Sequence, residues 1–261
     1  MKRAFTLLEL VVVLLVIALT THLAVREVLR VHDEKLVSAA DRQLDDIREA
    51  ALAFLSDTGR PVCATNGTLS ELWERPANLP EYRVMRASQS NLVKGVSSEI
   101  ADDSVYVPSG WRGPYLRMKT GALRLRDPWG NAIEAEDDAK VERVSWTDGL
   151  FAATVAHCGP RGRASERKSV SLLPRNYPSC TLTLWATGSS LSGDVRLAWY
   201  APCEGMITGG VKTVSAFSQH KFEGLTPGSR IVTATVAGSS VPVIKLVEVL
   251  PGDNMIEIKI P

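Results

Sequence analysis

The run from Phe5 to Ser56 contains neither glycine nor proline, and this is the feature that most restricts the fold. A single helix of about fifty residues, about 75 Å long, is therefore permitted. The first part of the run, from Phe5 to about Val25, is predominantly apolar, and as a helix it is about as long as the hydrocarbon core of a bilayer is thick. We predict that residues 5–25 span a membrane.

Beyond residue 25 the pattern of the same helix becomes amphipathic. Apolar residues recur at steps of three and four, at Leu36, Ala40, Leu44, Ile47, Ala51 and Phe54. Charged residues lie between them, at Asp41, Asp45, Arg48 and Glu49. One side of the helix is therefore expected to pack on a globular body, and Gly59 and Pro61 are expected to end the helix.

A carboxylate, Glu9, lies near the start of the apolar segment, where a charge costs at least a few kcal/mol unless it has a partner. Lys2 and Arg3 precede the segment and predict a cytoplasmic N-terminus, with the rest of the chain outside. An ordinary secretory signal is one alternative, but its nearest exit, Thr21 to Ala24, matches a cleavage site poorly. A permanent single-pass anchor is another, and it leaves Glu9 unexplained.

The stretch KRAFTLLEL resembles the processing signal of type IV prepilins and type II secretion pseudopilins. The resemblance implies cleavage between Ala4 and Phe5 by a prepilin peptidase, which leaves residues 1–4 as the leader, and methylation of the new Phe5 amine. It also implies a partner for Glu9, the amine of a neighbouring subunit in a filament, which fixes register more than it adds stability. Ala4 stands where that family usually has glycine.

Residues 26–163 resemble the body of the major type II pseudopilin in GWRGPYL (Gly110 to Leu116) and DPWGN (Asp127 to Asn131). The implied α+β fold is a pilin fold, in which the long helix packs on a small antiparallel sheet. The segment GALRLRDPWGNAIEA also predicts a β-hairpin from its own pattern. Its turn is Asp127, Pro128, Trp129 and Gly130, with Asp127 accepting backbone N–H groups and Trp129 covering the hairpin.

The rest of this body is less regular. Ala87 to Pro108 is predicted to be a loop insertion, and Val141–Trp146 and Leu150–Ala156 are predicted to be strands. The resembling family holds calcium in its last loop, through several oxygen ligands. Here Arg161 and Arg163 occupy that loop where acids are expected, so we expect the calcium site to be lost and no other cofactor to bind. Asp137, Asp138 and Asp148 are the candidate ligands that remain, and we prefer to interpret them as solvated turn residues.

The resemblance ends near Arg163, and residues 170–261 are expected to form a second domain after a linker at Ala164 to Ser169. Apolar runs separated by Gly, Pro and Ser turns predict an all-β sandwich, and the runs are CTLTLWAT, DVRLAWYA, KFEGL, SRIVTATVA, VPVIKLVEVL and MIEIKI. PheGluGlyLeuThrProGly, at Phe222 to Gly228, resembles carboxypeptidase-regulatory or prealbumin-like domains. A fold of this kind assigns no ligand.

Four cysteines, Cys63, Cys158, Cys180 and Cys203, lack the CxxC spacing of a zinc or redox site and allow three disulfide pairings. If each domain closes its own bridge, the pairs are Cys63–Cys158 and Cys180–Cys203. Disulfides require that the body leave the cytoplasm.

Nothing in the sequence favours catalysis or nucleic-acid binding. The formal net charge is +1, so no basic field is present. The histidines His22, His32, His157 and His220 are scattered and form no metal or triad spacing, and GSSLSG at Gly188 to Gly193 is interpreted as a β-turn. We expect no enzyme activity.

The sequence as a whole predicts a pseudopilin-like subunit anchored in a bacterial inner membrane, with its body in the periplasm. Its expected partners are other pilin-like subunits, the prepilin peptidase and an inner-membrane assembly platform. One alternative is a low-abundance tip or adhesin-like pilin whose sandwich binds a substrate or a surface. Another is an anchored periplasmic protein that never assembles.

Overall fold

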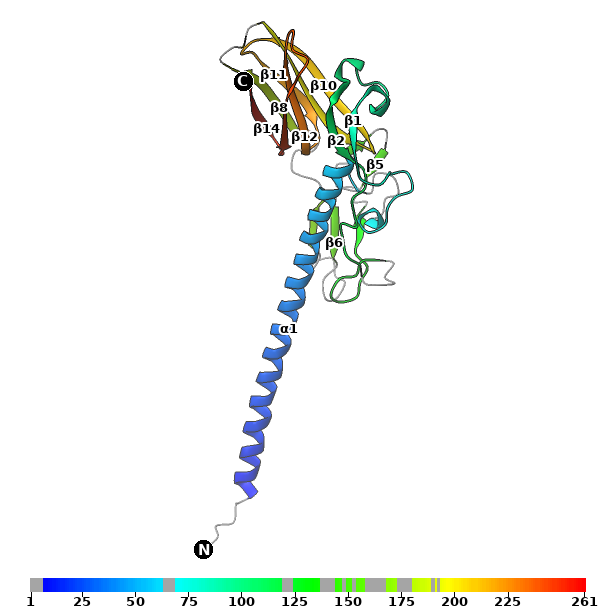
Figure 1. Cartoon of the computed structure of the whole chain (residues 1–261). Helices are drawn as coiled ribbons and strands as arrows, with labels where there is room; N and C mark the ends of the chain where they lie inside the picture. Colours follow the sequence, from blue (N-terminus) through cyan, green and yellow to red (C-terminus); the bar gives the residue numbers. More distant parts are fainter. Residues whose placement is uncertain are drawn as a thin grey trace.

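The computed structural model describes residues 7–62, 69–118, 124–136, 144–146, 149–151, 154–157, 168–172, 180–188, 191 and 193–261. One long helix leads into a β-rich body, which places the chain in the α+β class (Figure 1). The helix points away from the body, and the β-sandwich lies beyond the end of the helix that is opposite the N-terminus.

Helix α1 (Leu7–Thr58) is continuous over 52 residues, as the absence of Gly and Pro predicts. Ala40, Leu44, Ile47, Ala51 and Phe54 are buried, Leu36 is half-buried, and Asp45, Arg48 and Glu49 are exposed. The predicted packing side is therefore confirmed. The helix ends at Gly59, which adopts a φ of +74° and donates its N–H to the Leu55 carbonyl.

The described part of the body next to the helix contains the short 3-10 helices η1 (Leu69–Leu72), η2 (Gln89–Asn91) and η3 (Ser98–Ile100). Its strands are β1 (Arg83–Ala87), β2 (Asp102–Ser109), β3 (Glu134–Glu136), β4 (Val144–Trp146), β5 (Gly149–Phe151), β6 (Thr154–His157) and β7 (Lys168–Ser171). They form the antiparallel sheets β1-β2, β3-β6-β7 and β4-β5. The core against α1 includes Leu72, Leu79, Ile133 and Val155.

Three boundaries differ from those predicted. Leu150–Ala156 is not one strand, because β5 pairs with β4 while β6 pairs with β3 and β7. The predicted linker and the predicted domain start at residue 170 both overlap β7, which pairs with β6, and Leu172 lies in the core against α1. The first body therefore extends to Leu172, and the sandwich begins at Cys180.

The sandwich consists of β8 (Cys180–Thr187), β9 (Asp194–Cys203), β10 (Met206–Ser215), β11 (Gln219–Leu225), β12 (Gly228–Val236), β13 (Val243–Val249) and β14 (Asp253–Lys259). Its sheets have the orders β10-β9-β12-β13 and β11-β8-β14, and the β8–β14 pair is parallel. The strand alternation points Leu182, Leu184, Leu197 and Val232 into the core between the sheets.

Strand β10 was absent from the sequence prediction because Gly209 and Gly210 interrupt its pattern. The structure explains both glycines. A Cβ on Gly209 would lie 2.4 Å from the Trp199 carbonyl oxygen, and a Cβ on Gly210 would lie 2.6 Å from the Trp199 indole nitrogen. Trp199 therefore occupies the space that side chains at these two positions would need, with its backbone carbonyl at Gly209 and its indole ring at Gly210.

The segment predicted as a loop insertion, Ala87 to Pro108, contains the connection after β1 and most of β2, and with β1 it forms a hairpin that covers the sandwich. Strands β1 and β2 lie over the outer side of the β10-β9-β12-β13 sheet (Figure 1). Met85, Val105 and Val107 of the hairpin share one buried cluster with Tyr200, Ile207 and Ile231 of the sandwich. The two parts are thus joined through a common core, as well as through the chain between them.

Candidate functional site: the long helix and its junction with the body

The apolar half of α1 has no protein around it. From Leu10 to Val25 every side chain is exposed, including Leu15 at 65% and Leu23 at 58%. The helix is long and apolar enough to cross a membrane. The hydroxyl of Thr20 donates to the Val16 carbonyl and that of Thr21 to the Ile17 carbonyl, so neither requires water. The structure thus contains a single-pass membrane helix candidate.

The predicted processing residues Ala4 and Phe5 lie outside the described residues. Glu9 lies within α1, and the position of its side chain is not described. Cleavage before Phe5, methylation of Phe5 and pairing of Glu9 all stay predictions.

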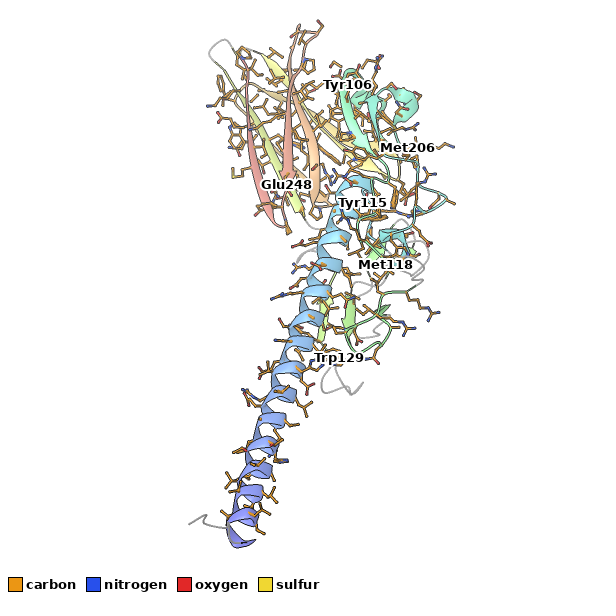
Figure 2. All side chains as sticks on the ribbon, turned by 60° about the horizontal axis from the view of Figure 1, so that its bottom comes forward. Tyr106, Tyr115, Met118, Trp129, Met206 and Glu248 are labelled. Carbon is orange, nitrogen blue, oxygen red and sulfur yellow. The ribbon has the colours of Figure 1, made fainter. Side chains whose placement is uncertain are left out.

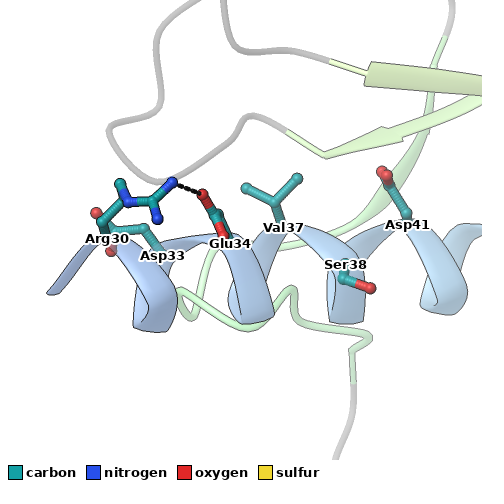
Figure 3. Close-up of a pocket in the computed structure, with 6 residues that line it drawn as sticks. All are labelled: Arg30, Asp33, Glu34, Val37, Ser38 and Asp41. Carbon is teal, nitrogen blue, oxygen red and sulfur yellow. Dashed lines mark hydrogen bonds and ion pairs between the residues drawn. The ribbon is translucent and has the colours of Figure 1, made fainter. Parts of the chain in front are cut away.

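Above the membrane segment the surface of α1 carries charged groups. Arg30 pairs with Glu27 and Glu34, and all three side chains are exposed. A shallow groove follows this part of the helix and is lined by Arg30, Asp33, Glu34, Val37, Ser38 and Asp41 (Figure 3). Asp41 in turn pairs with Lys168 of β7 at 2.6 Å, which ties the helix to the first sheet.

The GWRGPYL motif surrounds the C-terminal end of α1. The backbone N–H of Gly110 donates to the carbonyl of Asp57, and the Tyr115 hydroxyl donates to Asp57 Oδ2 at 3.0 Å. Arg112 Nε lies 2.9 Å from the same oxygen. Burial raises the pKa of Asp57, while Arg112 and Tyr115 oppose that shift. Burial likewise raises the pKa of Tyr115. The motif therefore fixes the helix end by polar contacts.

A buried ion pair joins the helix end to the rest of the body. Arg60 Nη2 lies 2.9 Å from Glu71 Oε1, with the Arg60 side chain 0% exposed and that of Glu71 1% exposed. The other guanidinium nitrogen is 3.9 Å from Glu204, in the β9–β10 turn of the sandwich. The sequence does not predict this pair, since nothing in TGRP distinguishes a buried arginine from an exposed one.

The sandwich contacts the helix end directly. The Glu204 backbone N–H donates to the Thr58 carbonyl at 2.7 Å, and the Ser229 N–H donates to the Ser56 hydroxyl at 3.3 Å. A Cβ on Gly59 would lie 1.9 Å from the Pro202 carbonyl oxygen. Gly59 is therefore required both for its positive φ and for this close approach.

The DPWGN motif forms a turn beside α1. Asp127 Oδ1 accepts the backbone N–H of Trp129 and of Asn131, and the Asn131 side chain donates to Asp127 Oδ2. The Gln43 amide of α1 donates to the Arg126 carbonyl, which holds the turn against the helix. Trp129 is half-buried and lies beside the helix (Figure 2). In this geometry Asp127 is a structural residue.

Cys180 and Cys203 are free thiols, so the predicted Cys180–Cys203 bridge is not formed in this structure. The two residues start β8 and end β9, on opposite sheets. Burial raises the pKa of both thiols, to about 11 for Cys203. Cys63 and Cys158, the other proposed pair, lie outside the described residues.

Within the described ranges no group of three or more His, Cys, Asp or Glu side chains could hold a metal ion. Asp137, Asp138, Asp148, Arg161 and Arg163, which concern the calcium loop, lie outside those ranges. His220 packs edge-on against Phe222, and burial lowers its pKa. Its contacts are those of a packed strand residue.

Comparison of the sequence with protein-family models and with curated proteins gave no match.

Proposed function

We propose that this chain is a filament subunit of the type II pseudopilin and type IV pilin class. The observation that carries the proposal is the division of α1 into two halves. One half is apolar and exposed all round, and the other packs on an α+β body. A lone membrane anchor needs no rigid continuation of this length, whereas a bundle of subunits gains a long shared contact from it.

The proposed route starts in the inner membrane, with Lys2 and Arg3 inside and the body in the periplasm. The prepilin peptidase removes residues 1–4 and methylates the Phe5 amine. An assembly platform then brings subunits together, and Glu9 pairs with the Phe5 amine of a neighbour as the apolar helices pack. The function of such a subunit is mechanical, and the bodies coat the filament.

Intact-mass analysis tests this proposal, with the chain isolated from membranes that contain or lack the prepilin peptidase. We expect a chain that begins at methylated Phe5 only when the peptidase is present. A chain that begins at Met1 in both cases, or one cut near Ala24, overturns the proposal.

A second candidate is a tip subunit present in few copies. It is favoured by the position of the sandwich beyond the end of α1, where it adds bulk along the direction of growth (Figure 1). Quantitative mass spectrometry of sheared filaments separates the two candidates. A tip subunit is expected at a small fraction of the abundance of the other pilin-like subunits, and comparable abundance excludes it.

A further inference from the structure

The end of the sandwich that is far from the helix carries an exposed phenylalanine in an unfavourable backbone conformation. Phe217 lies in the turn between β10 and β11, with a φ of +64° and 61% of its surface exposed. The Ser218 N–H donates to the Ser215 carbonyl and closes the turn, so Phe217 occupies a position that usually holds Gly or Asn. A bulky residue there destabilises the fold and adds nothing to the core. Such an outlier indicates a function outside folding.

The location of Phe217 follows from the strand register. Ser215 pairs with Asp194 at the start of β9, while Cys203 at the end of β9 lies next to the helix. Phe217 and Val241, which is 74% exposed, are therefore at the distal end of the sandwich. Asp194 is the only charged side chain in the described distal turns, residues 193–194, 215–219 and 236–243.

The opposite end of the same body contains a cleft of about 190 Å³, where the sandwich, the hairpin and the helix end meet. Val107, Pro108, Ile231 and Leu246 give it apolar walls. Leu246 is 68% exposed, although its cross-strand neighbour Ile231 is covered by the hairpin. We call this the junction cleft.

The junction cleft and the distal turns are complementary. The charged residues lining the cleft are Arg112, Arg230 and Asp57, and their formal charges sum to +1. The Arg112 side chain is 58% exposed. Asp194 beside the Phe217 turn is exposed and carries −1. Phe217 and an acid thus lie at one end of the sandwich, and an apolar cleft with a net positive lining, whose exposed Arg112 is paired with Asp57, lies at the other end.

We propose that the Phe217 turn of one subunit inserts into the junction cleft of the next copy of the same chain. A patch and a cleft at opposite ends of one molecule give a head-to-tail contact, which propagates into an open filament instead of closing a dimer. This inference rests on the proposed filament function and adds a second contact to it, between the periplasmic bodies. Strand β9 has 10 residues and is therefore about 33 Å long. Two copies in this contact are expected to be displaced from each other by about that distance along the strand.

The test is photo-crosslinking of the full chain in its own membrane, with p-benzoylphenylalanine incorporated at position 217. The matched control carries the same group at position 106, where Tyr106 is 49% exposed on the hairpin (Figure 2). We expect a homotypic adduct from position 217 only, mapped by mass spectrometry to peptides that contain Val107, Pro108 or Leu246. Adducts only to another protein or to lipid, or no adduct at all, overturn the proposal.

Two substitutions separate this contact from folding. Phe217→Gly relieves the positive φ, so its thermal midpoint is expected to be unchanged or higher, while sedimentable oligomers fall at least about tenfold. Leu246→Asp in the cleft should produce the same loss, and Val84→Ser, which changes another exposed apolar residue, should not. Normal oligomers in Phe217→Gly contradict the contact.

Intact mass of the same samples distinguishes the two proposals. A processed chain without the homotypic adduct refutes the head-to-tail contact and leaves the filament function standing. An unprocessed chain refutes the filament function, and an adduct between its copies still supports the contact.

Discussion

Replacing Arg60 with methionine is expected to destabilise the junction strongly, because the change leaves the Glu71 carboxylate without the guanidinium 2.9 Å away. Both side chains are excluded from water, and removal of one partner of such a pair costs about 3–5 kcal/mol. The contact to Glu204 adds little, since it is 3.9 Å long and the glutamate is 46% exposed. Against a total stability of about 5–15 kcal/mol the loss is large. It corresponds to a fall in melting temperature of about 6–20 °C.

Urea unfolding of the full chain in detergent, followed by tryptophan fluorescence, measures this effect. The double variant Arg60→Met/Glu71→Leu is expected to recover most of the loss, because the buried charge and its partner are removed together. Arg30→Met is the matched control. It breaks two ion pairs whose side chains are 59–62% exposed, and it should leave the urea midpoint essentially unchanged, because exposed pairs are screened by water. A cost below about 1 kcal/mol for Arg60→Met, or a double variant as unstable as the single one, refutes the reasoning.

Glu9→Ala should leave membrane insertion and leader cleavage intact but block stable assembly, and normal incorporation in sheared-filament fractions argues against the role given to Glu9. Gly209→Ala should cost about 1–3 kcal/mol in the same urea assay, because its Cβ meets the Trp199 carbonyl, and an unchanged midpoint contradicts this account of β10. Cys203, with a pKa of about 11 against an ordinary 9.0, should react with iodoacetamide at pH 8 about 100-fold more slowly than a free cysteine, since only the thiolate reacts. Rapid alkylation of Cys203 in the folded chain speaks against its burial.

The helix and the strand rhythm were predictable because each depends on a local pattern. Apolar residues that recur with the helical period of 3.6 predicted that Ala40, Leu44 and Ile47 pack on the body. The absence of Gly and Pro predicted the length of α1. Alternation identified β8, β9 and β12 of the sandwich in the same way. Strand β10 was not predicted, because Gly209 and Gly210 break the alternation. The reason for both glycines is the close approach of Trp199, which lies on β9.

The junction was not predictable for a related reason. The hairpin residues Val105 and Val107 lie in a stretch rich in Asp and Ser, and their burial depends on a sheet that begins about ninety positions later in the sequence. Arg60 gives no local signal of burial, because its partners Glu71 and Glu204 come from two other segments. Long-range contacts of this kind follow from topology, which a single sequence specifies only indirectly.

These same contacts bear on how the sandwich moves with the helix. A second domain joined by a linker alone is free to reorient, which is the usual expectation for neighbouring domains. Here the Glu204 N–H caps the Thr58 carbonyl, Arg60 bridges toward the β9–β10 turn, and the hairpin shares a core with Tyr200 and Ile231. Reorientation requires all three contacts to break, including the apolar interface between the hairpin and the sandwich. We therefore expect the sandwich to move with the end of α1 as one body. A displacement of the helix along its axis would then displace the distal turns by the same distance, because these contacts join the two parts directly.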